Sequence, residues 1–165
     1  MTTSWENIVE VLRSEIAEYG GLLGLFEQQQ RCLFRRDADT VLQLSAEIEL
    51  QVRTADEVRR RRERIVAAFA AAHNYPANAT LRSLLPFMLI EVRPLIEALM
   101  AEVNRLIHRI RRATRHNHLL LTRVVETHQE ILRHLRPDAY TKTYTPDGRV
   151  CLAGTRPTPA LQAAG

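Results

Sequence analysis

The six histidines are the residues of this chain best suited to metal binding or acid–base catalysis, because an imidazole ring can bind a metal ion or transfer a proton near neutral pH. No two of them stand four residues apart, the spacing that places two metal ligands on one helix face. The nearest pair, His116 and His118, points to different faces. The sequence contains no glycine-rich phosphate loop, nucleophile elbow or cysteine–histidine arrangement. We therefore predict a binding protein with no metal, no cofactor and no enzymatic activity.

Arginine supplies nearly all of the positive charge, since Lys142 is the one lysine among 23 basic residues and the formal net charge is +4. A basic chain raises nucleic acid as a partner. The charge is segregated, however: residues 1–30 contain five glutamates and one arginine, whereas residues 105–136 contain eight arginines and two glutamates. Helices of opposite sign that pack together need no outside partner to explain their charge.

Two arginine-rich stretches are candidate binding surfaces. The run at residues 59–64 spreads around a whole helix circumference and follows Asp56 and Glu57, which favours a solvated surface. A second row follows one helix face in steps of three and four: Arg105, Arg109, Arg112 and His116. This row is the better candidate for an acidic partner. It has no interleaved aromatic residue, so base stacking would contribute little.

Several features favour the cytoplasm. Cys32 and Cys151 match no disulfide or zinc spacing, so we expect free thiols in a reducing compartment. The N-terminus has no basic region ahead of an apolar run, so no signal peptide is predicted. The most apolar window, residues 84–92, is far shorter than a membrane span and contains Pro86.

Long helices must position these residues. Apolar side chains recur in alternating steps of four and three, the rhythm of a helix packed along its length against others. We predict helices at about residues 4–36, 38–74, 80–86 and 92–136. They indicate an all-α fold, an elongated antiparallel bundle of three long, coiled-coil-like helices with a short extra helix before the last one. Residues 1–136 would form the bundle domain, and residues 137–165 a flexible C-terminal tail.

Local signals mark the predicted helix ends. A capping box spans Thr3–Glu6, and Asp37 and Thr80 are expected to be N-caps of later helices. Three glycines at positions 20, 21 and 24 lie within the first helix. The apolar stripe stays in phase across them, so we expect one continuous helix with a close helix contact there.

The apolar stripe of the last helix is interrupted by two polar residues, Asn117 and Thr127. Asn117 either sets the helix register at some cost in stability or offers its amide to a partner helix. The last helix is about ten residues longer than the first, about 15 Å at the helical rise. If both start at the same end, apolar residues near its C-terminus are left uncovered, and such surfaces mark partner sites. They are Val124, Val125, Ile131, Leu132 and Leu135.

The chain changes character after Pro137. Residues 140–144 are β-prone, residues 146–148 form a turn sequence, and a short apolar cluster follows at residues 150–152. Tyr144, beside this turn, is either incidental or the anchor of a short docking motif.

The chain resembles the FlgN-type flagellar export chaperones over most of its length. The resemblance rests on an N-terminal helical hairpin, an arginine-rich second helix, and a long last helix that contains His-Asn-His-Leu-Leu-Leu at residues 116–121. It continues through Ile131-Leu132-Arg133-His134-Leu135-Arg136-Pro137 and the tail motif Tyr144-Thr145-Pro146-Asp147-Gly148.

This resemblance implies a cytoplasmic chaperone for hook–filament junction proteins of the FlgK and FlgL type. It would bind their C-terminal helical segments, prevent premature assembly and deliver them to the flagellar type III export gate, with the export ATPase as a further candidate partner. Client binding would involve Asn117, Leu120, Leu121, Val124, Val125, His128, Ile131, Leu132 and Leu135. Docking at the gate would involve Tyr144, Asp147, Gly148 and Val150. Neither nucleic acid nor membrane insertion is expected.

Two alternatives stay open from the residues alone. One is a basic helical protein that binds nucleic acid through Arg105, Arg109 and Arg112, and the other is a self-associating coiled-coil scaffold. The identity of the client and the choice between a monomer and a weak homodimer are also open.

Overall fold

The computed structural model describes residues 5–135, together with the backbone of residues 142–144 and 150–152. The chain falls into two compact units, residues 1–119 and residues 120–165. The last helix contributes to both, because it belongs to the first unit up to Leu119 and to the second from Leu120 onward.

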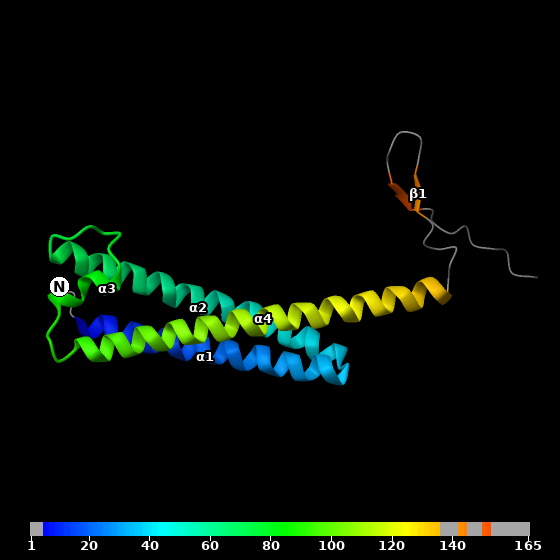
Figure 1. Ribbon diagram of the computed structural model, residues 1–165, viewed down its shortest axis with the longest axis horizontal. Coiled ribbons are helices and arrows are strands. Elements are labelled where there is room, and N and C mark those ends of the chain that lie inside the picture. The colour runs from blue at the N-terminus through cyan, green and yellow to red at the C-terminus, as the bar shows by residue number, and fades with distance from the viewer. Residues whose placement is uncertain (1–4, 136–141, 145–149, 153–165) are drawn as a thin grey trace, which may run out of the picture. The chain divides into compact units, whose positions relative to one another are not determined.

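Helices account for most of the described chain (Figure 1). In order, they are α1 (Trp5–Arg35), α2 (Ala38–Ala72), α3 (Leu81–Leu84), the 3₁₀ helix η1 (Leu85–Phe87) and α4 (Arg93–Leu135). The three long helices pack against one another in the first unit, and a short helix precedes the last long one. The predicted all-α bundle is therefore confirmed. Among the described residues, no helix has the length and apolar character needed to span a bilayer.

The connection between α1 and α2 is a tight turn. Arg36 adopts a left-handed conformation with φ of 59°, and Asp37 then caps α2. One carboxylate oxygen of Asp37 accepts from the Thr40 backbone N–H at 3.2 Å, and the other accepts from the Thr40 hydroxyl at 2.7 Å. Because these bonds satisfy a backbone donor left over at the helix start, they stabilise this end of α2. The N-cap predicted at Asp37 is confirmed.

The connection from α2 to α4 contains the second predicted cap. Asn74 is left-handed with φ of 55° after α2 ends, and the Thr80 hydroxyl oxygen accepts from the Ser83 backbone N–H at 3.3 Å. Thr80 is thus the N-cap of α3, as predicted. The capping box predicted at Thr3–Glu6 begins outside the described residues.

The core of the first unit lies between the three long helices and the short α3–η1 segment. Its fully buried side chains include Ile8 and Leu12 of α1, Leu84 of α3 and Ile96 of α4. Helix α1 also buries Ile8, Val11 and Leu22, so its apolar face is wider than a single stripe with four-three spacing. A helix that packs against two neighbours needs a wider apolar face than a two-stranded coiled coil does.

Glycine allows α1 and α2 to approach closely at one point. A Cβ atom added to Gly21 would lie 3.3 Å from the Gln51 side-chain nitrogen of α2. Gly20 and Gly24 have open space instead. Helix α1 continues through all three glycines, as expected.

The second unit contains the last turns of α4 and a two-stranded antiparallel sheet. Strand β1 (Lys142–Tyr144) pairs with β2 (Val150–Leu152), and the register places Tyr144 opposite Val150. Both strands fall where the sequence is β-prone or apolar, on either side of the predicted turn.

Candidate functional site

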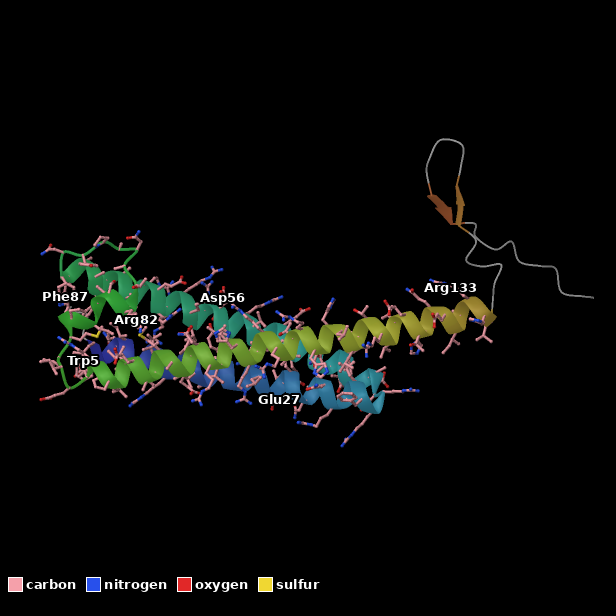
Figure 2. All side chains as sticks on the ribbon, in the orientation of Figure 1. Trp5, Glu27, Asp56, Arg82, Phe87 and Arg133 are labelled. Carbon is pink, nitrogen blue, oxygen red and sulfur yellow. The ribbon has the colours of Figure 1, made fainter. Side chains whose placement is uncertain are left out.

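The last turns of α4 carry an exposed apolar surface. Val125 is 53% exposed, Leu135 is 72% exposed, and Val124, Ile131 and Leu132 are also open to solvent. Leu120 and Leu121 are half-buried. The second unit therefore presents a row of large apolar side chains at helical spacing, which is the form of surface that receives an amphipathic helix. Figure 2 shows side chains along these turns, with Arg133 labelled near the end.

Polar side chains within this row bond to their own helix. His128 donates from Nδ1 to the Val124 carbonyl oxygen at 2.8 Å, and the Thr127 hydroxyl donates to the Arg123 carbonyl oxygen at 2.9 Å. These bonds to the preceding turn hold the polar groups against the backbone. His128, a residue that the sequence assigned to client binding, therefore has its Nδ1 bonded within its own helix.

Asn117 occupies a different environment, because it is 2% exposed in the core of the first unit. Its amide nitrogen donates to the Phe26 carbonyl oxygen at 2.8 Å and to the Gln29 side-chain oxygen at 3.0 Å. Gln29 in turn donates to the Ser45 hydroxyl at 3.1 Å, and Ser45 donates to the Val41 carbonyl oxygen at 2.8 Å. A polar chain thus connects α4, α1 and α2.

This network supports the interpretation of Asn117 as a register-setting residue. A buried polar group has its best hydrogen bonds in one alignment of the helices, so sliding α4 along α1 would break both bonds of the amide nitrogen. The amide oxygen of Asn117 has no hydrogen-bond partner within the described part of the chain. Contact between Asn117 and a client would require this side chain to be uncovered.

The predicted basic row on α4 is largely satisfied by neighbouring side chains. Arg105 forms an ion pair with Glu102, and Arg109 forms one with Glu27 of α1 at 3.2 Å. The His116 ring lies 2.7 Å from the Gln30 side-chain nitrogen, and Phe34 approaches the same ring edge-on. Of the four residues in this row, Arg112 has no such contact within the described chain, and its side chain is exposed. Some of the positive charge of α4 is therefore paired with negative charge of α1 in the same chain, as the segregation of charge predicts.

The arginine run on α2 is also paired. Arg59 contacts Asp56 at 2.6 Å and Glu63 at 2.7 Å, and Arg60 contacts Asp56 at 2.8 Å. These partners lie three or four residues away on the same helix, the arrangement expected for a solvated helix surface.

Sequence reasoning missed one buried ionic group. Glu15 of α1 is fully buried, and its carboxylate lies 3.0 Å from the Arg62 Nε of α2. Burial raises the pKa of the neighbouring Tyr19 hydroxyl to about 12, with a further contribution from the Glu15 charge. Arg62 lies between Val58 and Ile65, two apolar residues at helical spacing, and that position was the signal in the sequence for an inward-facing charge. The group connects α1 to α2.

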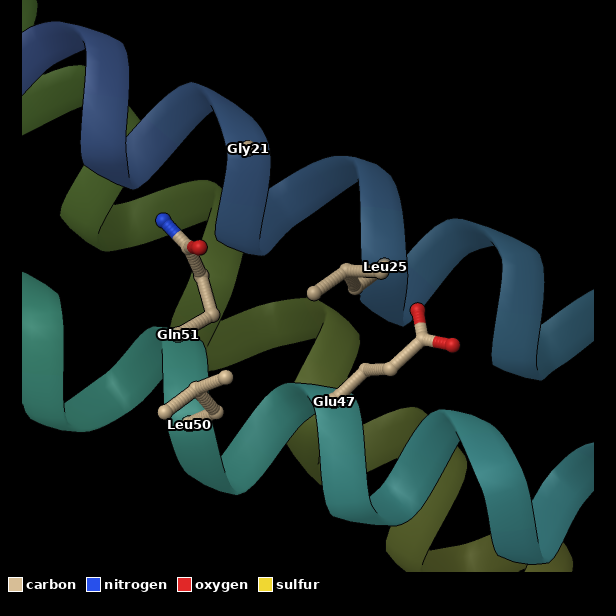
Figure 3. A pocket seen from close by; sticks show the side chains of 5 residues that line it. All are labelled: Gly21, Leu25, Glu47, Leu50 and Gln51. Carbon is tan, nitrogen blue, oxygen red and sulfur yellow. The ribbon is translucent and has the colours of Figure 1, made fainter.

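A hollow between α1 and α2 has few side chains that could bind or react with a ligand (Figure 3). It is lined by Gly21, Leu25, Glu47, Leu50 and Gln51. The Gln51 amide already donates to the backbone and carboxylate oxygens of Glu18, at 3.1 and 2.6 Å. Glu47 is the one ionisable group in the lining. Elsewhere in the described chain, no three histidine, cysteine or acidic side chains gather in a way that could hold a metal ion.

The predicted docking residues of the tail are only partly described. Tyr144 and Val150 are paired in the sheet of the second unit, whereas Asp147 and Gly148 lie outside the described residues. The backbone register therefore brings two of the four predicted positions opposite one another.

A family model described as FlgN protein matches residues 1–150. The match covers the helices and extends through the tail motif to the first residue of β2. No curated protein and no solved structure matches the sequence.

Proposed function

The chain belongs to the FlgN family of flagellar export chaperones, and we propose that its clients are the hook–filament junction proteins. In this proposal, the protein binds their C-terminal helical segments in the cytoplasm and prevents their premature assembly. It then delivers them to the type III export gate, where the export ATPase is a further partner.

The proposed client site lies on the last turns of α4 and is formed by Leu120, Leu121, Val124, Val125, His128, Ile131, Leu132 and Leu135. The exposure of its five large apolar side chains from Val124 to Leu135 is the observation that supports the proposal. A segment that polymerises through an apolar helix face must have that face covered until export, and a second apolar helix can cover it without nucleotide or covalent chemistry. Asn117 would set the register of α4 within the first unit.

The affinity expected for such a site suits a chaperone that must release its client. A client segment that folds on binding loses conformational entropy, and this loss offsets part of the favourable burial of apolar surface. The complex can then be tight enough to prevent assembly and weak enough to dissociate at the gate.

We assign docking at the gate to Tyr144, Asp147, Gly148 and Val150. A tyrosine beside a turn offers a large, rigid contact surface at low entropic cost, which suits a short recognition motif. Because this motif shares no residue with the proposed client site, the proposal allows client and gate to be bound at the same time.

A pair of matched variants tests the client site. Val125→Asp with Leu132→Asp places two charges in the apolar row, whereas Leu42→Asp with Leu50→Asp places two charges on exposed leucines of α2. Binding of a junction protein's C-terminal segment, measured by calorimetry, should weaken at least about tenfold in the first variant, because buried apolar anchors carry most interface energy. The α2 variant should bind normally.

The outcomes separate the two proposed sites. Equal binding by both variants would refute the site on α4. Tyr144→Ala should leave client binding unchanged and reduce export of the client from cells. If Tyr144→Ala exports the client normally, the assignment of Tyr144 to the gate is wrong while the client site stands.

A further inference from the structure

A second surface of α4, within the first unit, carries positive charge without nearby compensation. Between residues 103 and 119 the helix contains five arginines and no acidic residue. Three of the five are exposed and form no ion pair within the described chain: Arg111, Arg112 and Arg115. The remaining two, Arg105 and Arg109, are the ones paired with Glu102 and Glu27.

These three arginines share one side of the helix. Arg115 follows Arg111 by four residues and Arg112 by three, so their side chains are neighbours on the helix surface. Leu119, four residues after Arg115, extends the same side and is 50% exposed. We call these four residues the outer strip. At about 100° per residue, the strip lies opposite the buried positions Val103, Leu106 and Asn117.

The outer strip differs from the other arginine-rich surface of the protein. On α2, Arg59 and Arg60 have carboxylates within one turn of the same helix. Like charges three or four residues apart repel each other, and no carboxylate among the described residues forms an ion pair with the outer strip. An acidic ligand would relieve it, and that is a source of binding energy which the α2 surface lacks.

From this arrangement we propose that the outer strip binds an acidic, amphipathic helix of a partner protein. The partner's carboxylates, at steps of three and four, would pair with the arginines, and one apolar side chain would cover Leu119. Arginine suits this role because its planar guanidinium pairs with carboxylates through two parallel hydrogen bonds. The inference concerns residues 111–119 and does not depend on the client site proposed above.

Two observations favour a protein over a nucleic acid. Helix α4 contains no phenylalanine, tyrosine or tryptophan, so bases would lack the large aromatic side chains on which they stack best. The strip also includes Leu119, and a phosphate backbone offers nothing apolar to cover it. The ion pairs in the first unit, from Glu15–Arg62 to Glu27–Arg109, show that its arginines readily take carboxylate partners.

The probe is a labelled peptide of about 20 residues, long enough to be helical alone, with glutamates along one stripe and leucines beside them. Fluorescence anisotropy with the full chain should show binding that weakens as salt is added. Replacing Arg111, Arg112 and Arg115 by glutamine should weaken this binding about tenfold or more, since three charge-assisted contacts are lost. The matched control replaces three exposed arginines elsewhere, Arg31→Gln, Arg53→Gln and Arg64→Gln, and should change the affinity less than about twofold.

Further experiments distinguish general electrostatic attraction to a basic protein from specific binding at the outer strip. Leu119→Ser should weaken peptide binding without changing its salt dependence, because it removes an apolar contact and no charge. A peptide with glutamine in place of glutamate should not bind. The proposal is overturned if both triple variants lose affinity equally, if the peptide does not bind at low salt, or if duplex DNA binds more tightly than the peptide. The Val125→Asp, Leu132→Asp variant should still bind the peptide, which separates this surface from the client site.

Discussion

The two parts of α4 have the same spacing of apolar residues, but these residues are buried in one part and exposed in the other. Up to Leu119, the helix buries Ile96, Val103 and Leu106 in the core of the first unit. From Leu120 onward, side chains at equivalent steps of three and four, such as Val124 and Ile131, are exposed. The spacing therefore predicts that a face can be buried, but it does not say what covers it. We propose above that a client covers this exposed face.

The largest expected difference between the two parts is in stability. Ile96→Ala should lower the free energy of unfolding by about 2–5 kcal/mol, because Ile96 is fully buried and its loss leaves a cavity. Ile131→Ala should change it by less than about 0.5 kcal/mol, because Ile131 is 51% exposed. Urea unfolding followed by circular dichroism measures both values.

This pair of variants can disprove the difference in burial between the two parts of α4. If Ile131→Ala destabilised the protein as much as Ile96→Ala, the last turns of α4 would have a cover within the protein or in a second copy. Repeating the unfolding at several protein concentrations distinguishes these cases, since stability that depends on self-association rises with concentration.

The two polar residues of the stripe give a second, smaller contrast. Asn117→Ala should cost about 1–3 kcal/mol, because it leaves the buried Gln29 amide oxygen without its donor and removes a second bond to the Phe26 carbonyl. Thr127→Ala should stay within about 0.5 kcal/mol, since the Thr127 hydroxyl is exposed and bonds only to its own helix. The same unfolding assay applies. A cost for Asn117→Ala no larger than that for Thr127→Ala would show that the network does not hold α4 in place.

Much of the bundle follows from local signals in the sequence. The four-three spacing indicated three long helices, and side-chain chemistry at Asp37 and Thr80 marked where two helices begin. These predictions succeed because each depends on residues within one or two turns of each other. The turn between α1 and α2 is set by the same short-range rules.

The buried polar groups could not be predicted in the same way. Glu15 and Gln29 look like surface residues of α1, yet both are buried. Each is tolerated because a partner from another helix meets it, Arg62 for Glu15 and Asn117 for Gln29. Such pairs depend on how two helices are aligned, and the period of a single helix does not contain that information. The ion pair between Arg109 and Glu27 could not be predicted for the same reason, because it joins residues 82 positions apart.

The smallest effect we predict is the pH dependence that Tyr19 gives to the buried part of the bundle. The pKa of its hydroxyl is raised from 10.0 to about 12 by burial and by the nearby Glu15 carboxylate. A raised pKa in the folded state means that the folded protein holds the proton more tightly, so the stability from Tyr19 is complete below pH 10 and is lost as the pH rises toward 12. Unfolding measured across this range should therefore show a steeper loss of stability in the wild type than in Tyr19→Phe. Identical slopes of stability against pH in the two proteins would mean that Tyr19 is more open to water than its place beside Glu15 and Arg62 indicates. The core of the first unit would then differ less from the exposed end of α4 than the burial of their side chains implies.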